Sequence, residues 1–140
     1  MSPELDALLC QRYPQIFADR HASMQTTCMC WGFSCGDGWF QLIDTLCANL
    51  QRMTDEDGAP QIIAVQVKEK FGVLTVSIND RSDDVLAIFD KYARRSAAIC
   101  IVCGKPLHYS EDETRAVLQL FKCVVCTDCK PKFGNRTLYG

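Results

Sequence analysis

Two Cys-x-x-Cys pairs dominate the chemistry that this chain of 140 residues could perform. The first pair, Cys100 and Cys103, lies in CIVCGK, and the second, Cys126 and Cys129, lies in CTDCK, with 22 residues between the pairs. Two such knuckles commonly supply four thiolates to one tetrahedral Zn²⁺ ion. Gly104 directly follows the first pair, where a tight turn favours a residue without a Cβ. The spacing therefore predicts a zinc site with these four cysteines as ligands.

Three other kinds of chemistry use cysteines at this spacing. A redox dithiol needs one pair at a helix N-terminus, but here a predicted helix ends before Cys100 and Pro131 follows the second pair. An iron–sulfur cluster would use the same four ligands. A disulfide framework is disfavoured, because the start of the chain, MSPELDALLC, lacks the profile of a secretory signal and cytosolic thiols stay reduced. We therefore favour zinc, in a cytoplasmic protein.

Two residues of the segment between the pairs could replace a proposed ligand. Cys123 stands at the same spacing from Cys126, and His108 lies in the same segment. CTDCKP has the compact polar linker of a knuckle, whereas CVVC has β-branched residues that suit a strand, so we retain Cys126 and Cys129. His108 is expected at the surface. The capping box SEDE at 110–113 favours a helix, whereas RAVLQLFKCVV could equally be a strand, so the segment is predicted to form a short helix or turn followed by a strand.

Four cysteine ligands predict a structural role for the ion, because they leave no coordination position for water or substrate. About 45 C-terminal residues with few large apolar side chains cannot form much of a core. A zinc site contributes on the order of 10 kcal/mol in small peptides at neutral pH, which offsets that deficit. An enzyme that uses a Cys/His pair with His21 or His108 is an alternative.

Apolar periodicity predicts the elements that position this site. The clearest helix lies in DGWFQLIDTLCANLQRM, with Asp37 as its expected cap. Its apolar face consists of Trp39, Leu42, Ile43, Leu46, Cys47 and Leu50. An earlier helix is expected in SPELDALLCQRY, capped by Ser2, and a later one in DRSDDVLAIFDKYARRSA. Residues 15–35 are expected to form a long ordered loop that packs on the core.

A β-hairpin is predicted between the second and third helices, because two runs of alternating apolar residues flank a glycine. Ile63, Val65 and Val67 are expected on the buried face of its first strand, with the turn at Phe71 and Gly72. The turn, with its charged neighbours, is also a candidate contact surface. An isolated hairpin is marginally stable, so it is expected to pack on the second helix.

The expected fold class is therefore α+β. A small helix/β-hairpin body is predicted over residues 1–96, and a four-cysteine zinc ribbon over residues 97–140. No segment has the ~20 continuous apolar residues of a membrane span, so no membrane partner is expected.

The charge is unevenly distributed along the chain. Residues 1–90 contain six Lys/Arg and thirteen Asp/Glu, whereas residues 91–140 contain nine Lys/Arg and four Asp/Glu. A basic tail could bind nucleic acid, and it could equally attract the acidic body of the same molecule. The candidate nucleic-acid contacts are Lys105, Lys122, Lys130, Lys132 and Arg136.

The segment CMCWGFSCGDGW at 28–39 also combines residue types that do chemistry. Its three cysteines could bind a second metal, but Cys-x-Cys-x4-Cys is an uncommon spacing for structural zinc, and buried cysteines that act as small apolar residues are favoured. Its glycines before a helix could cradle an anion. The Asp37 carboxylate would repel an anion bound there, so these glycines are predicted to form a structural turn.

Four segments in order resemble small, largely uncharacterised proteins of tailed phages and prophages. The segments are YPQIFADR, WGFSCGDGWFQLIDTLC, VQVKEKFGVLTVSI and ARRSAAICIVCGKP. The resemblance covers about residues 13–106, CGDGW and VKEKFG are its more specific parts, and CTDC fits the same pattern. It implies a phage or prophage origin and action inside a bacterial cell, and it implies no reaction.

These observations lead to the expectation of a protein that binds a macromolecule without catalysis. Because small phage accessory proteins often act on host machinery, the expected partner is a bacterial protein of defence or regulation. The alternative is a regulatory zinc ribbon that binds nucleic acid.

Overall fold

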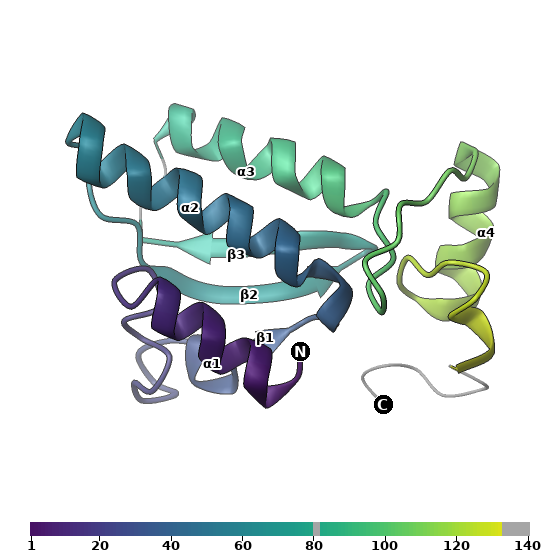
Figure 1. Ribbon diagram of the computed structural model, residues 1–140, viewed down its shortest axis with the longest axis horizontal. Coiled ribbons are helices and arrows are strands. Elements are labelled where there is room, and N and C mark those ends of the chain that lie inside the picture. The colour runs from purple at the N-terminus through teal and green to yellow at the C-terminus, as the bar shows by residue number, and fades with distance from the viewer. Residues whose placement is uncertain (80–81, 133–140) are drawn as a thin grey trace.

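Four helices and three strands form an α+β fold within residues 1–79 and 82–132, the part of the chain that the computed structural model describes (Figure 1). The helices are α1 (Pro3–Arg12), α2 (Phe40–Asp57), α3 (Asp83–Ser96) and α4 (Glu111–Phe121). The strands are β1 (Phe33–Ser34), β2 (Ala64–Lys70) and β3 (Val73–Ile78). The predicted fold class is confirmed at this level.

The predicted apolar face of α2 is the centre of the core. All six of its residues, from Trp39 to Leu50, are buried, and Trp39 is fully buried. The helix ends where Gly58 adopts a left-handed conformation with φ of 71°. The expected cap is wrong, because a 3₁₀ turn at Asp37–Trp39 precedes α2. The Asp37 carboxylate instead accepts a hydrogen bond from the backbone N–H of Ser2 at 2.6 Å.

The predicted first helix is present, and the long loop expected over residues 15–35 is present in part, because Met29–Trp31 form a 3₁₀ turn and Phe33–Ser34 form β1. Ser2 caps α1 through its side chain, which accepts a hydrogen bond from the Leu5 N–H at 3.4 Å. The loop packs on the core through buried side chains at Ile16, Phe17, Met29 and Phe33. Two of its large apolar residues do not pack down, since Met24 is 66% and Trp31 69% exposed.

The hairpin is confirmed, with its turn at Phe71 and Gly72 between β2 and β3. β1 pairs with β2 in parallel, which gives the sheet order β1-β2-β3. The expected buried face of β2 is wrong in part, because a β-bulge between Ala64 and Gln66 shifts the alternation. Ala64 and Val67 are buried, and Val65 is only half-buried.

The helices α2 and α3 run beside each other along the hairpin, and α1 lies on the side of β1 (Figure 1). The end of α3 is fixed to β3, because the buried Ser96 hydroxyl accepts a hydrogen bond from the Leu74 N–H at 2.8 Å. None of the helices in residues 1–79 and 82–132 is long and apolar enough to cross a membrane.

The segment between the two cysteine pairs forms α4, which stands apart from the other helices, near the hairpin turn (Figure 1). The predicted capping box is confirmed, with Ser110 and Glu113 each bonded to the other's backbone N–H. The strand expected before Cys126 is wrong, because residues 122–126 form no strand. Val124 and Val125 are instead buried in an irregular segment. The boundary between residues 96 and 97 stays a prediction.

Candidate metal centre

The four cysteines of the two predicted pairs come together in space. One Sγ atom from each of Cys100, Cys103, Cys126 and Cys129 lies within 4.8 Å of the others. The Sγ atoms of Cys103 and Cys126 are 3.7 Å apart. Metal–sulfur bonds of about 2.3 Å in a regular tetrahedron give sulfur–sulfur edges of about 3.8 Å. The separation of Cys103 and Cys126 matches such an edge, and the cluster of four could hold one metal ion.

The first knuckle is a tight turn that brings Cys103 back beside Cys100. Gly104 donates its N–H to the Cys100 carbonyl at 2.9 Å, and the Cys100 N–H donates to the carbonyl of Lys105 at 2.9 Å. Gly104 has a φ of +77°, in the left-handed region, which explains why the turn needs glycine. An isolated β-bridge between Ile99 and Pro106 closes the base of the knuckle.

The second knuckle repeats this geometry and is bonded to the first. Cys129 and Lys130 both donate their N–H groups to the Cys126 carbonyl at 3.1 Å. The Ile101 N–H, inside the first knuckle, donates to the Val124 carbonyl at 2.9 Å. On the outside, the exposed Lys105 ammonium contacts the Asp128 carboxylate at 2.9 Å and joins the two turns. The two knuckles therefore form one unit.

The body holds the first knuckle through the glycines of the 28–39 segment. The Gly38 N–H donates to the Ile101 carbonyl at 2.9 Å. A Cβ on Gly36 would lie 2.1 Å from the Ile101 carbonyl oxygen, and a Cβ on Gly38 would lie 2.1 Å from that of Cys100. These glycines permit close backbone contact, which agrees with the structural turn that the sequence favours. Trp39 completes the contact, since its Nε1–H donates to the Ile99 carbonyl at 3.1 Å.

Sequence reasoning identified these glycines but not their contact with the knuckle. The signal was present in CGDGW, where two glycines flank an acidic residue immediately before a buried tryptophan. The knuckle that this segment contacts lies about 60 residues later in the chain. The groups contacted there are backbone carbonyls, which every residue has, so no sequence pattern marks them. We define this contact between Gly36–Trp39 and Ile99–Gly104 as the knuckle seam.

The alternative ligands lie outside the cysteine cluster. Cys123 is buried, and its thiol donates to the Phe121 carbonyl at 3.4 Å. Burial raises the pKa of this thiol to about 12, so it stays protonated. His108 is exposed, as expected.

The 28–39 segment forms no second metal-ligand group in the part of the chain that the structure describes. Its three cysteines differ in burial. Cys35 is buried and Cys30 half-buried, whereas Cys28 is exposed, so the expectation of buried cysteines is wrong for Cys28.

The thiols of the cluster differ in acidity. Burial opposes ionisation of Cys126, but hydrogen bonds from Cys129 and the other thiols outweigh this effect and lower its pKa to about 7. Burial, together with the hydrogen bonds to these thiols, raises the pKa of Cys129 to about 12. Burial also raises the pKa of Cys100. Because metals bind thiolates, loading the cluster releases protons, and the metal affinity falls as the pH falls.

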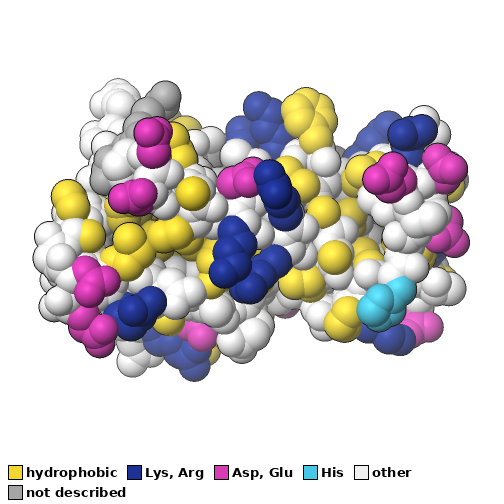
Figure 2. Space-filling model, turned by 90° about the horizontal axis from the view of Figure 1, so that it is seen from above, with side chains coloured by type: hydrophobic (Ala, Val, Ile, Leu, Met, Phe, Trp, Pro, Cys, Tyr) yellow, Lys and Arg dark blue, Asp and Glu magenta, His cyan; other side chains and the backbone are white. Residues whose placement is uncertain are grey.

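The predicted nucleic-acid contacts are partly engaged within the protein. Lys105 contacts Asp128, and the Lys130 ammonium lies 5.0 Å from the centre of the Tyr109 ring. Lys122 and Lys132 are exposed. Arg136 lies outside the described residues. Figure 2 shows Lys and Arg side chains both near the middle and toward the ends of one face, with Asp and Glu side chains among them. This face therefore presents charges of both signs.

Comparison of the chain with protein-family models, curated proteins and solved structures finds no match to any of them.

Proposed function

We propose that this protein is a zinc-binding accessory protein of phage or prophage origin that acts by binding a macromolecule, without catalysis, in the bacterial cytoplasm. The observation that carries the proposal is the group of four cysteine sulfurs within 4.8 Å of one another. Four protein thiolates complete a tetrahedral coordination sphere, so the ion stabilises structure and does not activate water or substrate. The C-terminal region that contains the two knuckles and α4 is called the cysteine module. Its proposed role is recognition of the partner.

Zinc is the ion that fits this donor set best. Zn²⁺ prefers tetrahedral thiolate sites, and the sulfur separation of 3.7 Å matches the tetrahedral edge. We assign the module to the zinc-ribbon class on its paired knuckles, with α4 as an insertion between them. Iron–sulfur chemistry uses the same ligands, and metal analysis separates the two.

A bacterial protein of defence or regulation is the proposed partner. Large apolar side chains are exposed on several elements, among them Met24, Trp31 and Leu120 at 66%, 69% and 76%. Exposed aromatic and aliphatic side chains are typical anchors of protein interfaces. Nucleic acid is the weaker candidate, because Lys105 is paired with Asp128 and acidic side chains share the surface with the basic ones.

The metal is tested by elemental analysis of the purified chain. We expect about one zinc per chain, and loss of the zinc in Cys103→Ser. Cys28→Ser is the matched control, because Cys28 is also exposed but lies outside the cluster. Iron in place of zinc, or full zinc content in Cys103→Ser, would contradict the assignment.

The partner is tested by affinity capture from bacterial extract, followed by binding of the purified candidate to the wild-type protein and to Cys103→Ser. We expect zinc-dependent binding to one host protein and little change with salt. Binding of duplex or single-stranded DNA that weakens steeply with salt, and falls in Lys130→Glu/Lys132→Glu, would favour the nucleic-acid alternative.

A further inference from the structure

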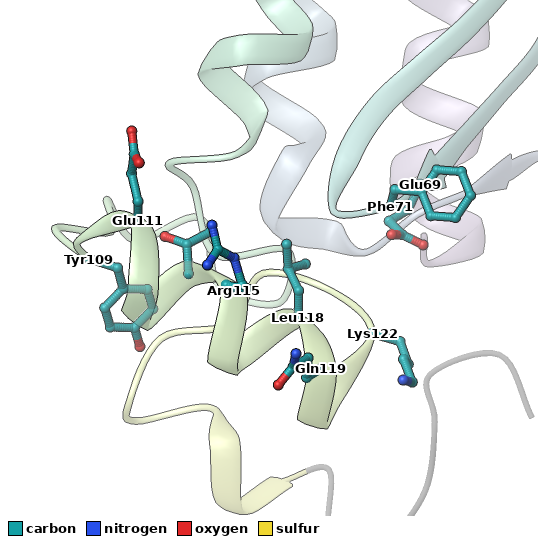
Figure 3. Close-up of a pocket in the computed structure, with 9 residues that line it drawn as sticks. Glu69, Phe71, Tyr109, Glu111, Arg115, Leu118, Gln119 and Lys122 are labelled. Atoms are coloured by element: carbon teal, nitrogen blue, oxygen red, sulfur yellow. The ribbon is translucent and has the colours of Figure 1, made fainter.

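A groove of about 880 Å³ separates the hairpin turn from α4 (Figure 3). Glu69 and Phe71 lie on the hairpin side, and Leu118 on the α4 side. The two walls are in close contact at Gly72. The Leu118 side chain leaves no room for a side chain there, since an added Cβ would lie 2.5 Å from Leu118 Cδ2. The Gly72 N–H also donates to the Glu69 carboxylate at 2.8 Å. Internal contacts therefore fix the position of the turn against α4.

Both edges of this groove carry a residue in an unfavourable backbone conformation. Among the residues that the structure describes, the non-glycine residues with positive φ are Phe71, at 53°, and Lys122, at 62°. Both line the groove. Phe71 occupies the first position of a two-residue hairpin turn, where asparagine, aspartate or glycine is preferred. Backbone strain of this kind persists where structure or function requires it.

The fold of one chain does not explain why Phe71 is phenylalanine. Its side chain is 84% exposed, and the contact found for its ring is the Lys70 ammonium, 5.6 Å from the ring centre. The residue therefore combines an unfavourable conformation with an apolar surface in water. An aromatic ring placed so beside a groove gains stabilisation when it is buried by a second molecule.

The charges that line the groove are balanced. Glu69 and Glu111 are acidic, and Arg115 and Lys122 are basic. A nucleic acid would bring its phosphates against two carboxylates, so the groove does not suit a polyanion. Two copies related by a two-fold axis can bring the acidic groups of one against the basic groups of the other. In each copy the exposed Phe71 ring also lies beside a groove that can receive the Phe71 ring of the partner copy.

We propose that this groove is the contact surface of a symmetric homodimer, in which Phe71 of each copy inserts into the groove of the other. The contact is isologous, so the same residues serve as projection and as receptor in both copies. Because it involves a second copy of this chain, the inference does not depend on the host partner proposed above; it requires that α4, which lies between the two cysteine pairs, is folded.

Sedimentation velocity of the full chain as purified, from about 1 to about 500 µM, tests the proposal. We expect the sedimentation coefficient of the wild type to rise with concentration from monomer to dimer. Phe71→Asn should raise the dimer dissociation constant by at least about 30-fold. Asparagine tolerates positive φ at this turn, so the variant should fold with an unchanged or higher melting temperature.

Two further variants sharpen the test. Arg115→Glu leaves three acidic groups and one basic group on each surface, so it should also weaken the dimer. Met24→Gln removes an exposed apolar side chain that does not line the groove and should change nothing. A wild type that is monomeric at all concentrations overturns the proposal and leaves the groove to a different protein. A dimer that Phe71→Asn does not weaken overturns it as well.

Discussion

The body and the cysteine module are stabilised in different ways. In the body, many large side chains share the burial, including Trp39, Ile43, Leu46 and Tyr92, each at most 2% exposed. Among the residues of the module that the structure describes, which end at 132, the cysteines make up much of the buried set, with few other apolar residues. Those other residues are Ile101, Val117, Val124 and Val125. Burial in the body is therefore distributed over many large side chains, whereas in the module it centres on the cysteines.

This difference shows why the knuckle seam matters. A module with so little apolar area needs a rigid support on at least one side, and Gly36, Gly38 and Trp39 of the body provide it. The seam consists of backbone contacts and one indole hydrogen bond, and the side chains of Trp39, Cys100 and Ile101 are fully buried beside it. Perturbations of the cluster, of the seam and of α4 should therefore differ in size and in the region affected.

Removing the metal should produce the largest effect and separate the two regions most clearly. Exhaustive chelation should remove stabilisation on the order of 10 kcal/mol from the module. Amide hydrogen exchange should then accelerate over residues 98–129, while α2 and the hairpin keep their protection. Exchange measured by mass spectrometry before and after chelation checks this. Equal loss of protection in both regions would show that the body also depends on the ion.

Gly38→Ala should have the next largest effect, because it acts on the seam. Its Cβ would lie 2.1 Å from the Cys100 carbonyl oxygen and 2.6 Å from the Gly104 nitrogen. Since both are backbone atoms, the knuckle must move, at a cost of about 3 kcal/mol. Metal affinity, measured by competition with a chromophoric chelator, should fall together with thermal stability.

Gly58→Ala is the matched control for this variant. Gly58 has a φ of +71°, but no atom lies within 4 Å of its added Cβ. The substitution should therefore cost about 1 kcal/mol from backbone conformation alone and leave metal affinity unchanged. An equal loss of metal affinity in both variants would contradict the role of the seam.

Trp39→Phe should have an intermediate effect on both regions. The variant keeps an aromatic ring in the core but removes the Nε1–H that bonds the Ile99 carbonyl. Loss of this part-buried hydrogen bond costs about 1 kcal/mol, and the smaller ring leaves unfilled space. Urea unfolding and metal competition measure the two consequences. Trp31→Phe, at a side chain that is 69% exposed, should leave both unchanged.

Features with a regular period or spacing could be predicted from the sequence. The apolar face of α2 repeats with the helical period, and all of its predicted residues are buried. The hairpin turn at Phe71 and Gly72 follows from two alternating runs. The cysteine cluster follows from ligand spacing, which the fold then brings together.

Features that depend on distant backbone groups could not be predicted. The β-bulge between Ala64 and Gln66 changes the buried face of β2 without a glycine or proline to mark it. Val124 and Val125 have strand propensity, but they are buried in an irregular segment, where Val124 accepts one hydrogen bond from Ile101. Burial against the first knuckle overrides the local preference there.

Ser110→Ala should have the smallest effect and should stay within the module. It removes the side chain that accepts the Glu113 N–H at 3.2 Å, and loss of such a cap costs about 1 kcal/mol. Ser110→Asp should restore the cap, because aspartate is an equally good N-cap residue. The readouts are the amide exchange rates within α4, which should rise, and the metal affinity, which should stay unchanged. A large loss of metal affinity would show that α4 positions Cys126, which the comparison of the two regions does not predict.

The capping box also gives α4 a pH dependence of known sign. The Ser110 N–H donates to the Glu113 carboxylate at 2.7 Å and lowers the pKa of Glu113 below its ordinary value of 4.5. A carboxyl whose pKa is lower in the folded state stabilises that state at pH values above 4.5, and this contribution is lost as the pH falls through the folded pKa. Because Glu113→Gln removes the titration, the stability of this variant should vary less with pH in that acidic range. An identical pH profile of the two proteins would show that the carboxylate contributes nothing, which leaves the Ser110 hydroxyl as the sole cap.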